Sequence, residues 1–170
     1  MIIEGGTEML LFRYKNYRHN EFINEHLSVL DDNGYVWLLK VGKRTSVSKL
    51  HSIIDSGGWM LLRAPKANKG ECYLAKYEEI SEENPKDAIY PEYYHEILAA
   101  NYDDDTFGYE PSYQWFKIVF LERLDEKYKN VFILEKTGKN INEVISTTRT
   151  AVMFIKPTED IRINKVIGAK

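Results

Sequence analysis

The pattern of apolar positions over the first 41 residues predicts a strand, a helix and a second strand. The short apolar run 9–14 predicts a buried strand. Between residues 20 and 34, apolar side chains recur at helical spacing, with Asn20 placed to cap the helix and a polar Asp-Asp-Asn-Gly stretch placed to end it. The nearly continuous apolar run 35–41 predicts a strand that is covered on both faces.

The segment that follows predicts a helix and a hairpin. Ser46 is placed to cap a helix whose inner face carries Leu50 and Ile54, and a Gly-Gly pair follows that helix. The apolar segments 59–64 and 71–80 predict two strands. The turn-forming residues between these segments indicate that the strands are joined as a hairpin.

Residues 81–111 interrupt this regular pattern. They hold three of the five prolines, and they predict one short helix from Pro91 to about Ala100 surrounded by exposed loop. Beyond them the pattern predicts three more strands and one more short helix. The strands are expected at 115–124, 131–134 and 151–155, and the helix at 140–145.

This order of short strands, mostly joined as hairpins, predicts an α+β fold. We expect a small curled or barrel-like mixed sheet flanked by short helices. The 170 residues are expected to form a single domain, 1–170, with an acidic insert at about 81–111. A hydrophobic fraction of 44% and a charged fraction of 29% exclude a disordered or fibrous chain.

The net charge of −3 conceals a strong asymmetry along the chain. Residues 34–77 carry eight basic and two acidic side chains, whereas residues 78–110 carry one basic and eleven acidic side chains. The overall charge alone argues against a generally basic nucleic-acid binder. The basic segment 34–77 removes that objection, because a local cationic surface is sufficient for binding phosphates.

Motifs for catalysis, cofactors and targeting are absent from the sequence. None of the four histidines has the H-E-x-x-H spacing of a helical zinc site, and neither a P-loop nor a nucleophile elbow occurs. The single cysteine, Cys72, lies in an expected strand, where a core thiol is the favoured interpretation. The consecutive acids 103–105 are expected to form a solvated loop, with a weak divalent-cation site as the alternative. We therefore expect no metal or cofactor and favour a role other than catalysis.

The beginning of the chain carries no secretory signal, and no apolar run has the length of a membrane span. These observations favour a cytoplasmic protein without a membrane partner.

Basic residues cluster where two expected loops lie in the segment 34–77. The first loop leads into the N-terminus of the helix capped by Ser46, and the second is the tip of the hairpin. Lys and Arg beside backbone N–H groups form natural phosphate sites. The expected phosphate-binding residues are Lys40, Lys43, Arg44, Arg63 and Lys66. The alternative is a merely solvated basic surface.

Aromatic residues lie among these charges and provide faces on which unpaired bases stack. A methylated base suits an aromatic cage in particular, because its methyl group gains apolar burial. The expected base pocket comprises Trp37, Trp59, Tyr73 and Trp115. The alternative is that Trp37 and Trp59 are core residues on buried strands.

Residues 35–80 resemble a known family. Tyr35-Val36-Trp37-Leu38-Leu39-Lys40 is similar to the opening strand of EVE-type domains of the PUA-like superfamily. Trp59, Arg63 and the segment 70–74 are similar to the family's later Trp, Arg and Gly-Asp positions. The resemblance implies a small β-barrel flanked by helices, which binds RNA or DNA with a modified base in an aromatic pocket that includes Trp37 and Trp59.

Three hypotheses of function remain. The first is a nucleic-acid-binding module for RNA or modified DNA. The second is a protein-interaction or regulatory accessory domain, whose acidic segment 78–110 faces a basic protein partner. The third is a small hydrolase or nuclease whose site is assembled from residues that lie far apart in the sequence.

Overall fold

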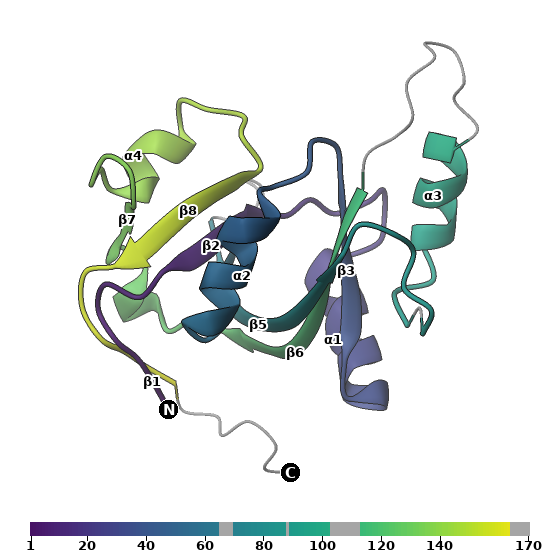
Figure 1. Ribbon diagram of the computed structural model, residues 1–170, viewed down its shortest axis with the longest axis horizontal. Coiled ribbons are helices and arrows are strands. Elements are labelled where there is room, and N and C mark those ends of the chain that lie inside the picture. Colours follow the sequence, from purple (N-terminus) through teal and green to yellow (C-terminus); the bar gives the residue numbers. More distant parts are fainter. Residues whose placement is uncertain (65–69, 88, 103–112, 164–170) are drawn as a thin grey trace.

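A computed structural model describes residues 1–64, 70–87, 89–102 and 113–163 (Figure 1). Seven strands form one mixed sheet. In spatial order they are β3 (Val36–Val41), β6 (Tyr113–Arg123), β5 (Cys72–Ser81), β4 (Trp59–Arg63), β2 (Met9–Arg13), β8 (Val152–Pro157) and β7 (Phe132–Leu134). Neighbouring strands are antiparallel except for β2 and β4, which are parallel.

The predicted α+β class, with a mixed sheet and short helices, is confirmed. Closure into a barrel is not observed. Within the described residues β3 pairs only with β6, and β7 pairs only with β8, so the sheet keeps two edges. A separate two-stranded ribbon joins β1 (Ile2–Ile3) to β9 (Ile161–Arg162), an element that the apolar pattern did not reveal.

One face of the sheet packs against two helices, α1 (Phe22–Asn33) and α2 (Val47–Asp55). Leu50 and Ile53 of α2 are fully buried against this face. The predicted cap of α2 is confirmed, because the Ser46 side chain accepts a hydrogen bond from the Lys49 N–H at 3.4 Å. Gly34 ends α1 in the left-handed conformation, as the sequence predicts.

The predicted cap of α1 is wrong. The residue that precedes the helix is Glu21, which makes no capping bond with its side chain. The Asn20 side chain instead donates to the Tyr17 carbonyl at 3.1 Å. The Asn16 side chain takes over the capping task, because its oxygen accepts from the Phe22 N–H at 2.9 Å.

The opposite face carries two separate apolar clusters. The first centres on Leu11, Leu61 and Phe132 and includes one buried residue each from the 3-10 helix η2 (Glu126–Tyr128) and from α4 (Ile141–Ile145). The second lies at the β3 edge and packs under α3 (Tyr94–Tyr102). Figure 1 shows α3 and α4 at opposite ends of the molecule. The strand β3 is covered on both faces, as predicted.

The described part of the acidic insert is more ordered than an exposed loop. Its first residue belongs to β5, and its helix begins at Tyr94, three residues beyond the expected Pro91. Tyr93, Tyr94 and Leu98 are buried against the sheet. The consecutive acids 103–105 lie outside the described residues.

Candidate functional site

Two arginines lie side by side where the parallel strands end. Arg13 is the last residue of β2 and Arg63 is the last residue of β4, and the pairing sets them in register. Paired strands lie about 4.8 Å apart, and partners in a parallel register share a face. Leu11 and Leu61, two residues earlier, point into the apolar cluster of the same face. The two guanidinium groups therefore emerge together at the edge of that cluster.

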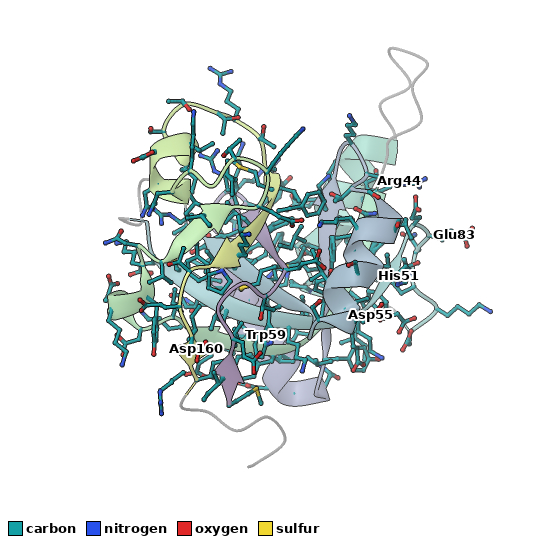
Figure 2. All side chains as sticks on the ribbon, turned by 60° about the vertical axis from the view of Figure 1, so that its left-hand side comes forward. Arg44, His51, Asp55, Trp59, Glu83 and Asp160 are labelled. Carbon is teal, nitrogen blue, oxygen red and sulfur yellow. The ribbon has the colours of Figure 1, made fainter. Side chains whose placement is uncertain are left out.

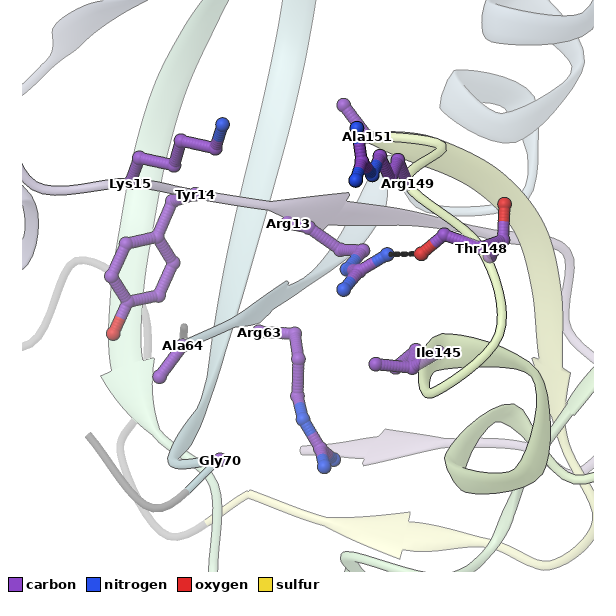
Figure 3. Close-up of a pocket in the computed structure, with 10 residues that line it drawn as sticks. All are labelled: Arg13, Tyr14, Lys15, Arg63, Ala64, Gly70, Ile145, Thr148, Arg149 and Ala151. Carbon is purple, nitrogen blue, oxygen red and sulfur yellow. Dashed lines mark hydrogen bonds between the residues drawn. The ribbon is translucent and has the colours of Figure 1, made fainter. Parts of the chain in front are cut away.

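These arginines line a cavity of about 700 Å³. Its walls come from the two strand ends, the beginning and end of the loop that joins β4 to β5, and the segment 145–151 between α4 and β8. Figure 3 shows Arg63 extending between Gly70 and Ile145, with Arg13 and Arg149 on the other border. The lining residues are Arg13, Tyr14, Lys15, Arg63, Ala64, Gly70, Ile145, Thr148, Arg149 and Ala151. We call this space the cationic cavity.

Arg13 connects β2 to the loop before β8. Its Nη1 donates to the Thr148 carbonyl at 2.6 Å and to the Thr150 carbonyl at 3.4 Å. Its backbone N–H donates to the Ala151 carbonyl at 2.8 Å. The guanidinium position is thereby fixed by neutral main-chain acceptors, and its charge is not neutralised by them.

Arg63 is held in a similar way from the other side. Its Nη1 donates to the Asn142 side-chain oxygen at 2.9 Å and lies 3.6 Å from the Cys72 sulfur. Gly70 makes room for this arginine, because a Cβ atom there would lie 2.9 Å from Arg63 Nη2. Burial raises the pKa of the Cys72 thiol, and the nearby Arg63 opposes this effect only in part. The thiol therefore adds no negative charge at neutral pH.

The cationic cavity holds four positive charges and no negative one among its lining residues. Arg13 and Arg63 are partly buried, and Lys15 and Arg149 are exposed. In the described part of the chain, neither Arg13 nor Arg63 forms an ion pair with a carboxylate. Guanidinium groups fixed in this manner and left without a counter-charge favour binding of an anion, and of phosphate oxygens in particular.

The structure separates the predicted phosphate-binding residues into two groups. Arg63 lines the cationic cavity. Lys40 lies near the C-terminal end of β3, and Lys43 and Arg44 follow that strand; none of these three lines the cavity. Lys40 is only 8% exposed, its ammonium donates to the Lys43 carbonyl, and burial lowers its pKa. Lys43 is exposed. The fifth residue, Lys66, lies outside the described residues.

Arg44 is occupied by contacts within the chain. It donates to the carbonyls of Tyr113 and Glu82, and its Nε lies 2.9 Å from the Glu82 carboxylate. Figure 2 shows Arg44 and Glu83 at the rim of the molecule. An arginine already paired with a carboxylate is a weaker phosphate ligand than one held by neutral groups. The predicted basic loop before α2 is therefore not part of the candidate site.

The four rings of the predicted base pocket do not come together. Trp37 and Trp115 are 2% and 0% exposed in the cluster under α3. Trp59 is 5% exposed in the other cluster of that face, where it packs edge-on against Phe120. Tyr73 lies at the margin of the cluster on the α1 and α2 face. The tryptophans thus serve as core residues in two separate clusters of one face, which for Trp37 and Trp59 is the alternative that the sequence left open.

The sequence did not reveal Arg13, Lys15 and Arg149 as site residues. Arg13 ends a strand just as Arg63 does, which is a local signal. Its relevance depends on the parallel pairing of β2 with β4, which joins segments about 50 residues apart. Arg149 lies in a polar loop that Arg13 fixes in place.

A second polar cluster joins three segments of the chain. The Lys49 ammonium lies 3.0 Å from a Glu8 oxygen and 2.5 Å from a Glu135 oxygen, and the Ser52 hydroxyl donates to Glu8 at 2.6 Å. These bonds lower the pKa of Glu8 and raise that of Lys49. One positive and two negative charges leave the cluster with a net charge of −1, and its bonds connect three elements of the fold.

The described residues contain no group of three or more His, Cys, Asp or Glu side chains that could hold a metal ion. They also contain no helix that is both long and apolar enough to cross a bilayer.

Comparison with protein-family models, with curated proteins and with solved structures gave no match.

Proposed function

We propose that this protein binds nucleic acid and that the cationic cavity receives its phosphate groups. The observation that carries the proposal is the register pair Arg13 and Arg63, two fixed guanidinium groups without a carboxylate partner among the described residues. Lys15 and Arg149 add two exposed charges to the same cavity. Phosphate contacts of this kind provide the main, salt-dependent part of nucleic-acid affinity.

Two further considerations support nucleic acid over a small inorganic anion. A volume of about 700 Å³ falls in the range of sites for nucleotide-sized ligands and exceeds what one phosphate ion needs. The resemblance of residues 35–80 to EVE-type domains, which implies RNA or modified DNA as ligand, agrees with the same conclusion. The PUA-like assignment is part of this proposal.

The acidic segment 78–110 offers less support for the protein-interaction hypothesis. Glu82 pairs with Arg44 at 2.9 Å, and Glu96 pairs with Arg18 at 2.9 Å. Glu78 and Glu79 both approach Lys117, at 3.6 and 3.9 Å. Much of the described charge is therefore balanced within the chain, which weakens the field available to a basic partner.

The test is a binding titration with fluorescently labelled, pooled single-stranded RNA and DNA at low salt. We expect the wild-type protein to bind, with log K falling as log salt rises. The double variant Arg13→Gln, Arg63→Gln should lose most of this affinity. Lys136→Gln serves as the control, because Lys136 is an exposed cation that does not line the cavity.

Single substitutions at the exposed residues refine the test. Arg149→Gln or Lys15→Gln should each lower the salt slope by about one if the residue contacts one phosphate. Absence of binding to either pool at low salt would overturn the proposal. Equal binding by the wild type and the double variant would also overturn it.

A further inference from the structure

This inference rests on the proposed function and concerns which phosphate the site selects. We infer that the cationic cavity recognises the phosphomonoester at the end of a strand in preference to the phosphodiesters within it. Such a group occurs on the 5′ or 3′ end of a cleaved or processed nucleic acid. The inference depends on the concentration of charge in the cavity and on the donors that its two inner arginines leave available.

The charges are concentrated in one place. Arg13 and Arg63 are register partners on adjacent strands, and Lys15 and Arg149 line the same cavity. Along a strand, each diester carries one negative charge and the charges are spread over successive nucleotides. A monoester carries about −1.5 to −2 at neutral pH on a single phosphorus. Four cations around one cavity match the second distribution better.

The hydrogen-bond donors lead to the same result. Each guanidinium has five N–H donors. The described contacts of Arg13 with Thr148 and Thr150 both use Nη1, as do those of Arg63 with Asn142 and Cys72. Within the described residues, Nε and Nη2 of both arginines are left without an acceptor. These are two of the atoms that bind planar or tetrahedral oxyanions in a bidentate manner.

The number of oxygens distinguishes the two ligands. A monoester presents three terminal oxygens, whereas an internal diester presents two. Two bidentate guanidinium groups fixed on neighbouring strands are suited to the first. Figure 3 shows that Arg13 and Arg63 approach the cavity from separate strands, with Arg149 beyond Arg13. Both arginines therefore line the space in which the monoester would be bound.

The first experiment compares oligonucleotides of one sequence that differ only at their ends. We would measure fluorescence anisotropy at pH 7.5 for strands with a 5′-phosphate, a 3′-phosphate or hydroxyl groups at both ends. We expect one phosphorylated form to bind about tenfold or more tightly than the hydroxyl form, as one or two additional charge-assisted bonds would produce. A nucleoside monophosphate and inorganic phosphate, added as competitors, separate recognition of a strand end from recognition of a free nucleotide.

The second measurement uses pH. The second ionisation of a phosphomonoester has a pKa of about 6, so its charge falls towards −1 at pH 5.5. None of the residues that line the cavity is His, Asp or Glu, and the Cys72 thiol beside Arg63 stays neutral. The charge on the cavity lining therefore stays constant in this range, whereas the charge on the phosphomonoester changes. We expect the preference for the phosphorylated strand to fall several-fold at pH 5.5, while binding of the hydroxyl strand stays nearly constant.

A variant can separate the effect of the bidentate guanidinium geometry on binding from the effect of positive charge. Arg13→Lys keeps the charge and removes the bidentate group, so it should lose most of the end preference and keep salt-dependent binding. Lys136→Gln should change neither quantity.

The outcomes separate the inference from the proposed function. Equal affinity for phosphate and hydroxyl ends overturns the inference and leaves the proposed function in place. Failure of every oligonucleotide to bind overturns both. If the nucleoside monophosphate binds as tightly as the phosphorylated strand, the ligand is a free nucleotide and the inference is overturned.

Discussion

Arg13 lies directly beside Arg63 in the parallel pairing of β2 with β4, and neither side chain has a carboxylate partner among the described residues. Like charges opposite each other in a sheet are destabilising. An anion placed between them removes this repulsion. The pair therefore costs stability in the absence of ligand, which is typical of residues retained for binding.

This relationship predicts that anions stabilise the fold. Phosphate or sulfate at about 10 mM should raise the melting temperature by about 2–4 °C relative to chloride at the same ionic strength, because a ligand that binds only the folded state stabilises it. The double variant Arg13→Gln, Arg63→Gln should melt at the same temperature in both salts. Differential scanning fluorimetry provides the measurement, and an equal rise in wild type and variant would contradict the prediction.

The elements that the sequence predicted well are those with local signals. The apolar run of β3, the Ser46 cap of α2 and the β4–β5 hairpin each depend on neighbouring residues. The cap of α1 was wrong because an asparagine four residues earlier, Asn16, reaches the same N–H as a cap at position 20 would. The local pattern does not show which of two nearby asparagine side chains accepts the bond from a given N–H in an irregular segment.

The candidate site was mostly beyond prediction because it is not local. Arg63 was expected to bind phosphate, but its partner Arg13 is brought beside it only by strand pairing. The tryptophans illustrate the reverse case. Trp37 and Trp59 lie in strands that are apolar on both faces, and both tryptophan side chains are buried in the core. Aromatic composition alone does not separate a stacking platform from a core ring.

Gly58 is predicted to be a position where any side chain is costly. It has a φ of +73°, and a Cβ atom there would lie 2.1 Å from the Tyr77 carbonyl oxygen. Gly58→Ala should lower the free energy of unfolding by about 3 kcal/mol or more, through backbone strain and displacement of β5. Gly34→Ala is the matched control, since its φ is +81° with open space around it. It should cost only about 1 kcal/mol. Urea denaturation measures both, and equal losses would show that the close approach is unimportant.

Removal of the Lys49 ammonium is predicted to destabilise the fold, because Lys49 connects three segments through its two carboxylate partners. Lys49→Met leaves Glu8 and Glu135 near each other without a cation. Because these side chains are about a quarter to a third exposed, the expected loss is about 1–2 kcal/mol rather than the larger value of a fully buried pair. A double-mutant cycle with Glu135→Gln should give a coupling energy of about 1 kcal/mol. Lys136→Met, at an exposed position, should change stability by less than about 0.5 kcal/mol.

His26 is predicted to make the protein less stable in mild acid. It is a buried residue of α1, where its Nδ1 lies 2.6 Å from the Phe22 carbonyl and its Nε2 is hydrogen-bonded to the Tyr94 hydroxyl of α3. That hydroxyl also accepts from the Leu39 N–H at 3.2 Å. A neutral imidazole that donates from Nδ1 and accepts at Nε2 satisfies all of these groups.

Burial lowers the pKa of His26 from 6.5 to about 4. The unfolded chain therefore takes up a proton before the folded protein does. The stability contributed by the neutral form is complete above pH 6.5 and is lost as the pH falls from 6.5 towards 4, by about 3 kcal/mol over that window. Urea unfolding at pH 7.5, 6 and 4.5 measures the loss. The variant His26→Gln has no imidazole at this position. Its free energy of unfolding should therefore fall by about 3 kcal/mol less than that of the wild type as the pH falls from 6.5 towards 4, even if the two proteins differ in stability at pH 7.5. Parallel pH profiles for the two proteins would show that other groups cause the acid sensitivity.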